Sequence, residues 1–148
     1  MSQSLTTRRQ ARIVALQALF QLINAPDYLT PDLAIRYALE VGKDPDEGYE
    51  DVEDLYLYQL VEGVVAHLEE IDTIISKHLT NWSIERLQRI DLSILRLAIY
   101  EMLYLDDETV PKTVAVDEAT ILARSFSDDK SRKFVSGILL KILNESEE

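Results

Sequence analysis

Apolar residues recur every three or four positions through almost all of this 148-residue sequence, which is the period of an amphipathic α-helix. Only four glycines and four prolines interrupt the pattern. No segment shows the strict alternation of apolar and polar residues that is typical of a half-buried β-strand. The sequence therefore predicts an all-α fold of six or seven helices, and its length fits one compact domain over residues 1–148.

Capping residues and helix breakers place the expected helices along the chain. Thr6 or Thr7 is expected to cap a first helix that runs to about residue 24, and Thr30-Pro31 begins a second that runs to about residue 41. Residues 42–50 are polar and are expected to form a loop. A helix from about residue 91 to 105 is apolar nearly all round, so we expect it at the centre of the core. The other expected helices cover residues 51–79, 113–125 and 130–143.

The residue types exclude most catalytic and metal sites. The chain contains no cysteine, so a disulfide, a thiolate metal site and a cysteine nucleophile are all excluded. The phosphate-binding motifs G-x-x-x-x-G-K-[ST] and G-x-G-x-x-G are both absent from the sequence. His67 and His78 do not belong to a metal-binding motif. We therefore expect no enzyme activity, no cofactor and no metal.

Charge is unevenly distributed along the chain. The formal net charge is −12, yet residues 1–26 hold three arginines and no acidic residue, while residues 40–72 hold twelve acidic residues and one lysine. A strongly acidic chain repels phosphate groups and is expected to bind nucleic acid poorly. A chain polarised in this way can nevertheless bind an anion at its basic end.

Cations stand at the starts of two expected helices, where the helix dipole disfavours them. Arg8, Arg9 and Arg12 lie in the first turns of the first helix, and Lys130, Arg132 and Lys133 lie at the start of the last. Free backbone N–H groups beside guanidinium groups form a phosphate site. This pattern predicts RNA binding, with Arg8 and Arg12 on one helix face; ordinary solvated charges are the alternative.

Two further features bear on packing and location. Gly63 and Gly137 fall inside expected helices, where glycine is unfavourable, and they predict close contact between helices.

Gln17 and Gln21 interrupt the apolar run near the N-terminus, and Arg96 and Glu101 interrupt the run from residue 94 to 105. Neither run resembles a signal peptide or a membrane span, so we expect a cytoplasmic protein.

Several blocks in the same order resemble the NusB family of bacterial transcription antitermination factors. The resemblance covers nearly the whole chain, is weakest at residues 25–55 and is strongest in the final third. The matching blocks read RRQAR at residues 8–12, ALQALF at 15–20, LVEGV at 60–64, ID at 90–91, ILRLAIYEML at 94–103, VP at 110–111, VAVDEA at 114–119, ARSF at 123–126 and SRKFVSGIL at 131–139.

This resemblance implies a fold of two small helical bundles and a role as an adaptor rather than an enzyme. Family members bind the boxA element of ribosomal RNA leader transcripts. They pair with NusE, a ribosomal protein that doubles as a transcription factor. The pair then joins other Nus factors on RNA polymerase and suppresses premature termination.

The resemblance also assigns roles to individual residues. The arginines Arg8, Arg9 and Arg12 match the RNA-contacting N-terminus of the family, and Phe20 matches an aromatic residue that faces NusE. The segment from Arg96 to Glu101 is a further expected partner surface. The remaining expected RNA contacts are Lys112, Asp129, Lys130, Ser131 and Lys133.

Three positions depart from the family pattern, and two other functions stay open. Thr113 replaces a basic residue after Val110-Pro111, Ser136 replaces the Asn before the helix glycine, and Asp117 replaces the Asn of the family's V-A-I-N-E-A block.

One alternative function is that of the N-terminal RNA-binding module of a ribosomal RNA methyltransferase, which the chain also resembles. The other is a homodimeric module that binds only protein.

Overall fold

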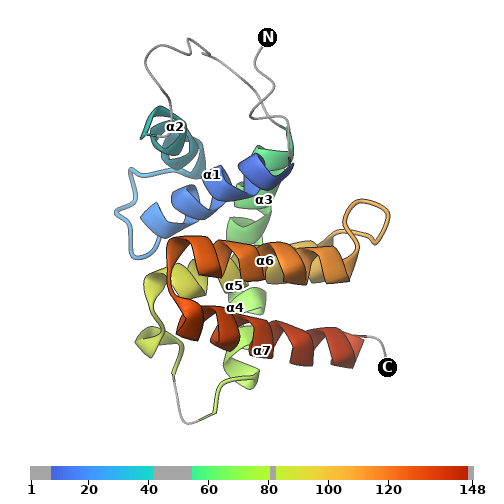
Figure 1. Cartoon of the computed structure of the whole chain (residues 1–148). Helices are drawn as coiled ribbons and strands as arrows, with labels where there is room; N and C mark the ends of the chain where they lie inside the picture. Colours follow the sequence, from blue (N-terminus) through green and yellow to red (C-terminus); the bar gives the residue numbers. More distant parts are fainter. Residues whose placement is uncertain (1–7, 42–54, 81–82, 147–148) are drawn as a thin grey trace. The chain divides into compact units, whose positions relative to one another are not determined.

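The computed structural model describes residues 8–41, 55–80 and 83–146. Over these ranges the chain forms seven α-helices and one 3-10 helix, and no strand (Figure 1). The predicted all-α fold is therefore confirmed. The chain divides into two compact units, residues 1–65 and 66–148. The single domain over residues 1–148 stays a prediction.

The first unit contains α1 (Arg8–Gln21), α2 (Pro31–Val41) and all but the last residue of α3 (Leu55–Ala66). Thr30 caps α2 as expected, because the Leu33 N–H donates a hydrogen bond to Thr30 Oγ1 at 3.2 Å. α1 ends three residues before the expected position, and Asn24 adopts a left-handed φ of 54°, which turns the chain towards α2. Gln21 then holds the two helices together, since its Nε2 donates to the carbonyl of Ala34 at 3.1 Å. The predicted caps Thr6 and Thr7 lie outside the described residues.

The second unit is built around α5 (Arg89–Tyr104), as the sequence predicts. The helix is buried along most of its length and packs against α4 (Leu68–Lys77), α6 (Lys112–Phe126) and α7 (Asp129–Ser146). The 3-10 helix η2 (Ile84–Arg86) leads into it. Within the described ranges, no helix is both long enough and apolar enough to cross a membrane.

The helix predicted over residues 51–79 is in fact two helices. α3 and α4 are separated at His67, whose φ of −115° and ψ of 22° lie outside the helical region. The His67 ring stacks on Tyr104 with 4.3 Å between ring centroids, and His67 Nδ1 lies 3.4 Å from Glu70 Oε1. His67 and Tyr104 are 37 positions apart in the sequence, so helical periodicity could not predict the break. The predicted start near residue 51 lies outside the described residues.

Candidate nucleic-acid interface

The start of α7 is fixed by Asp128. Its Oδ1 accepts a hydrogen bond from the Ser131 N–H at 2.8 Å, and its carbonyl accepts one from the Arg132 N–H at 3.0 Å. This is the geometry of a helix N-cap. The next residue, Asp129, accepts a hydrogen bond from Arg132 at 2.8 Å and lies 3.7 Å from Lys133 Nζ. The hydrogen bond from Arg132, more than the nearby charges, lowers the pKa of Asp129 below its usual value.

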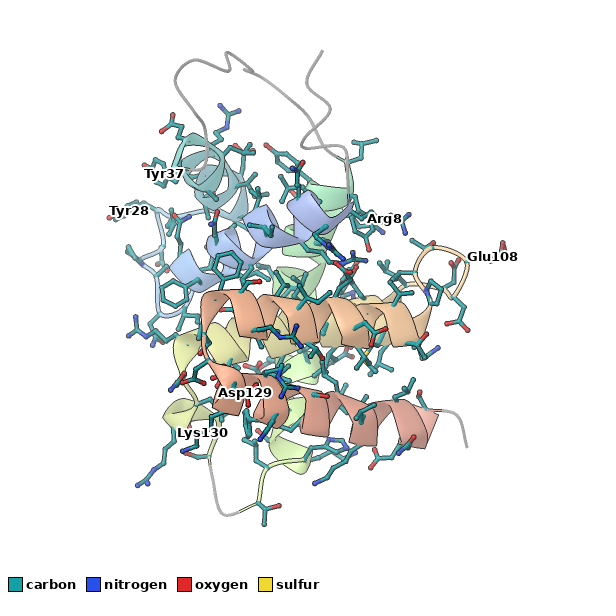
Figure 2. The ribbon with its side chains drawn as sticks, in the orientation of Figure 1. Arg8, Tyr28, Tyr37, Glu108, Asp129 and Lys130 are labelled. Carbon is teal, nitrogen blue, oxygen red and sulfur yellow. The ribbon has the colours of Figure 1, made fainter. Side chains whose placement is uncertain are left out.

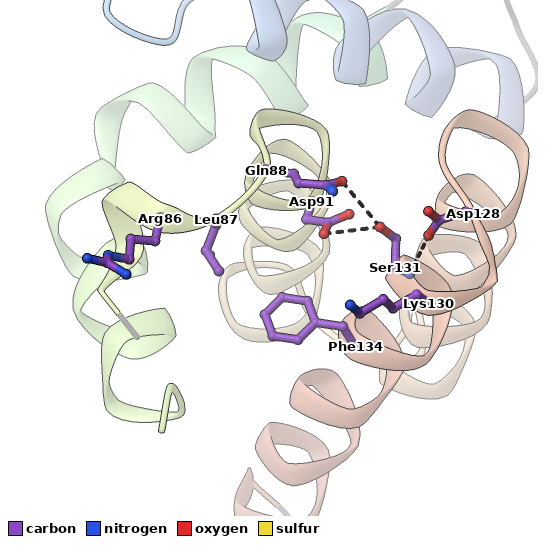
Figure 3. A pocket seen from close by; sticks show the side chains of 8 residues that line it. All are labelled: Arg86, Leu87, Gln88, Asp91, Asp128, Lys130, Ser131 and Phe134. Carbon is purple, nitrogen blue, oxygen red and sulfur yellow. Dashed lines mark hydrogen bonds between the residues drawn. The ribbon is translucent and has the colours of Figure 1, made fainter. Parts of the chain in front are cut away.

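Ser131 links the start of α7 to the start of α5. Its side chain is buried, and its Oγ donates to Asp91 Oδ2 at 3.2 Å, with Gln88 Oε1 at 3.5 Å as a second acceptor (Figure 3). Ser127 Oγ donates to Ser131 Oγ at 2.9 Å. Ser131 therefore positions the residues around it, and little of its own surface is available to a ligand.

A pocket of about 310 Å³ opens between η2 and the first turns of α5 and α7. This volume is near the lower end of the range typical of ligand sites, about 300–1,000 Å³. Leu87 and the Phe134 ring form apolar walls, and Lys130 lies beside the Phe134 ring (Figure 3). The pocket is lined by Arg86, Leu87, Gln88, Asp91, Asp128, Lys130, Ser131 and Phe134.

Asp91 is the unusual group in this pocket. Only 6% of its surface is exposed, and its Oδ1 finds no hydrogen-bond partner among the residues that the structure describes. Burial raises the pKa of Asp91 above its usual value, although the hydrogen bond from Ser131 acts in the opposite direction. A buried carboxylate oxygen without a partner is costly, and a ligand that donates a hydrogen bond would satisfy it.

The first unit presents a separate basic group at the start of α1. Arg8, which Figure 2 labels, and its neighbour Arg9 are exposed. No acidic residue lies in the first turn of the helix. The Arg8 guanidinium carbon lies 4.6 Å from the centre of the Tyr56 ring on α3, which is a cation–π distance. Tyr56 thereby orients one of the two exposed guanidinium groups.

The whole of this architecture matches one family. The family model described as "NusB family" matches residues 9–144. The chain belongs to the NusB family. The proteins named transcription antitermination protein NusB from Listeria innocua and Enterococcus faecalis are 46% and 47% identical to it. Those alignments cover 93% and 98% of this chain, and 97% and 94% of the relatives.

A solved structure of similar fold is described as antitermination factors NusB and NusE in complex with double-stranded RNA. It superposes with a TM-score of 0.74 and 29% identity, covering 93% of this chain and 96% of that one. Membership of the NusB family makes the chain a transcription antitermination factor and not an enzyme. Within the described ranges, no group of three or more histidine or acidic side chains could hold a metal ion.

Some of the residues predicted to contact RNA are exposed in the structure, and others are buried. Arg8, Arg9, Lys130 and Lys133 are exposed, whereas Ser131 is buried and Arg12 is only 4% exposed. Arg8 and Arg12 lie about one helical turn apart, but only the Arg8 guanidinium is exposed to a ligand. Lys112, at the start of α6, lies 3.2 Å from Asp107 in an ion pair. An RNA role for each of these residues stays a prediction.

The predicted partner residues differ in the same way. Phe20, at the end of α1, is 42% exposed and available to a protein partner. Arg96 is partly buried and donates two hydrogen bonds of 2.9 Å to the carboxylate of Asp72 on α4. Glu101 is only 1% exposed. Phe20 is therefore the strongest of the three candidates.

Sequence reasoning missed the pocket residues Leu87, Asp91 and Phe134 as a site. Helical periodicity places Asp91 at the start of one expected helix and Phe134 inside another, and it gives no sign that the two residues share a pocket. One signal was available: Asp91 is an acidic residue at the start of a helix that is apolar nearly all round. Such a position buries a charge, and a buried charge needs a partner from the fold or from a ligand.

Proposed function

We propose that this chain is an RNA-binding adaptor in transcription antitermination, which binds boxA-like single-stranded RNA and pairs with the ribosomal protein NusE. One observation carries the proposal: a pocket with apolar walls, a buried unpartnered carboxylate oxygen and lysine at its edge. Family membership and the solved complex of a similar NusB with NusE and RNA support it. Transcription in bacteria takes place in the cytoplasm, which is the location that we propose.

The pocket suits an unstacked nucleobase. Sequence-specific RNA recognition uses bases splayed out of the strand and stacked on aromatic side chains, and Phe134 offers such a ring. Asp91 Oδ1 would accept a hydrogen bond from an amino or imino group of the base. Lys130 would neutralise the adjoining phosphate.

Arg8 and Arg9 supply a second contact region in the first unit, where we propose that they bind phosphate groups. Arg12 is buried, so we give it a positioning role beneath them; its guanidinium carbon lies 5.9 Å from the centre of the Tyr56 ring. Because the net charge is −12, most of the remaining surface is expected to repel RNA. NusE, docked at Phe20, would add affinity that this chain lacks by itself.

The first test measures binding of a fluorescent boxA RNA by anisotropy, with and without NusE. Replacing Arg8 and Arg9 together by Gln is expected to lower the affinity about fivefold. The slope of log affinity against log salt should become shallower by about 1.4, since each phosphate contact to a single strand contributes about 0.7. Unchanged affinity and slope in the double variant would remove these arginines from the interface. No binding to the parent protein at low salt, even with NusE, would overturn the proposed function.

A second test uses the cost of burying Asp91. In Asp91→Asn, the one remaining side-chain oxygen can take the place of Oδ2 and accept from Ser131, and the NH₂ group then replaces Oδ1 and offers the base a donor in place of an acceptor. We expect about tenfold weaker RNA binding, together with a free energy of unfolding at pH 7 that is about 1 kcal/mol higher. The folded carboxyl binds its proton more tightly than the unfolded one, so parent stability is lost as the pH rises through and above the unfolded value near 3.8.

The stability advantage of Asp91→Asn should therefore be absent at the acid end of that range and should grow as the pH rises. Urea titrations at several pH values measure it. Asp129→Asn is the control, because Asp129 is exposed and its pKa is shifted in the other direction. An Asp91→Asn protein that bound RNA as well as the parent would refute the assigned role of the carboxylate.

The two competing functions make different predictions. A methyltransferase module would be expected to match longer relatives, whereas the curated relatives described above are themselves covered over 94–97% of their length. A purely protein-binding homodimer would keep its oligomeric state in the arginine and Asp91 variants and would ignore RNA. Light scattering combined with the anisotropy titration separates it from an RNA adaptor.

A further inference from the structure

Gly137 lies near the middle of the 18-residue helix α7 and is exposed. A methyl group built on its Cα would meet no atom within 4 Å. The prediction that Gly137 permits close packing of helices is therefore wrong within this chain. Glycine is among the poorest helix-forming residues and alanine is the best, so the fold itself gives no reason for glycine here.

The helix face around Gly137 has a distinctive composition. With about 100° of rotation per residue, five exposed residues fall within about 60° of Gly137 around the helix axis. We call this set the α7 face, and it consists of Lys130, Lys133, Gly137, Leu140, Lys141 and Asn144. It spans about 21 Å along the helix, carries three lysines and includes no acidic residue.

This absence of carboxylates contrasts with the chain as a whole, whose net charge is −12. Two acidic side chains of the same helix flank the face. Glu145 Oε1 lies 2.9 Å from His78 Nε2, and Asp129 lies 3.7 Å from Lys133 Nζ in an exposed pair. Exposed pairs of that kind contribute little, so the pair leaves Lys133 able to turn towards an anion.

We infer that the α7 face is a docking surface for the phosphate backbone of RNA that continues beyond the base pocket. Lys130 belongs both to the pocket lining and to this face (Figures 2 and 3), so the two surfaces are continuous. The missing side chain at Gly137 lets the strand lie against the helix backbone between Lys133 and Lys141. This inference rests on the proposed function and extends it to a longer RNA.

Charge complementarity favours RNA over a protein partner on this face. Protein interfaces are depleted in lysine and enriched in aromatic residues at their centres, whereas the α7 face has three lysines, one leucine and no aromatic residue. Phosphate contacts, by contrast, are commonly made by lysine side chains.

The experiment compares a core boxA RNA with versions that are four nucleotides longer at the 5′ end or at the 3′ end, all measured with NusE present. One extension is expected to raise the affinity for the parent protein about fivefold. Replacing Lys141, which is exposed and lies outside the predicted core contacts, by Gln should remove most of this gain, with little change in the affinity for the core RNA. Lys77→Gln combined with Arg124→Gln removes two exposed charges elsewhere on the second unit and should keep the gain.

Gly137→Ala separates an RNA-binding role of the α7 face from an effect on folding alone. The added methyl group meets open space, so we expect Tm to rise by about 2–4 °C, while the gain from the extension is lost. Equal gains in all the variants would overturn the inference. So would weaker NusE binding with unchanged RNA binding, because the α7 face would then bind protein. Failure of the core RNA to bind the parent would instead count against the proposed function itself.

Discussion

Phe134→Ala is expected to weaken the binding of boxA RNA by about tenfold to a hundredfold. Stacking of one base on an aromatic ring contributes about 1–3 kcal/mol, and tenfold in affinity corresponds to about 1.4 kcal/mol. Phe134 is only partly buried and forms one wall of the pocket, with Leu87 as the other (Figure 3). The measurement is an anisotropy titration at fixed salt with NusE present.

Two variants at the same position separate stacking from packing. Phe134→Tyr keeps the flat ring and should bind RNA within about twofold of the parent, whereas Phe134→Leu keeps an apolar side chain and should lose most of the stacking contribution. Thermal unfolding of each variant, followed by circular dichroism, checks that the fold is retained. If Phe134→Leu bound RNA as tightly as the parent did, the ring would not be a base-stacking platform.

The helices could be predicted from the sequence because periodicity and capping residues are local signals. Thr30-Pro31 begins α2 as expected, and the nearly all-apolar segment after Asp91 is the buried central helix α5. The break at His67 was not predictable in this way. It accompanies stacking on Tyr104, a residue 37 positions later, and no local pattern reports a contact of that range.

The candidate site shows the same limit. The sequence identifies cations at two helix starts, but it cannot say which of them the fold buries. Arg12 and Glu101 are both buried, although Arg12 was predicted to share a phosphate-binding face with Arg8 and Glu101 was predicted to belong to a partner surface. The pocket was missed for a related reason, because Leu87, Asp91 and Phe134 come from three segments that only tertiary packing brings together.

Asp72→Ala is expected to lower the free energy of unfolding by about 2–3 kcal/mol. The Asp72 carboxylate accepts two hydrogen bonds of 2.9 Å from Arg96, whose side chain is only 14% exposed. Removing the carboxylate leaves the partly buried Arg96 guanidinium without this counter-charge. The resulting loss of stability is larger than the net stabilisation that the intact pair contributes. Urea denaturation followed by circular dichroism measures the loss.

The chain offers a matched control in Asp32, which accepts a hydrogen bond of 3.1 Å from Arg36 on the exposed side of α2. Asp32→Ala should cost less than about 1 kcal/mol, because water replaces the lost partner. Replacing both residues of the partly buried pair, as Asp72→Leu with Arg96→Met, should recover much of the stability. Equal losses for Asp72→Ala and Asp32→Ala would contradict the assigned importance of burial.

The same Asp72 variants address the role that the sequence suggested for Arg96. The Arg96 guanidinium is held by a carboxylate of its own chain and its side chain is only 14% exposed, so little of it is accessible to another protein. We therefore expect the double variant Asp72→Leu with Arg96→Met to bind NusE within about twofold of the parent, provided that it is folded at the temperature of the titration. A large loss of NusE affinity in that folded variant would return Arg96 to the partner surface and give the ion pair a second function.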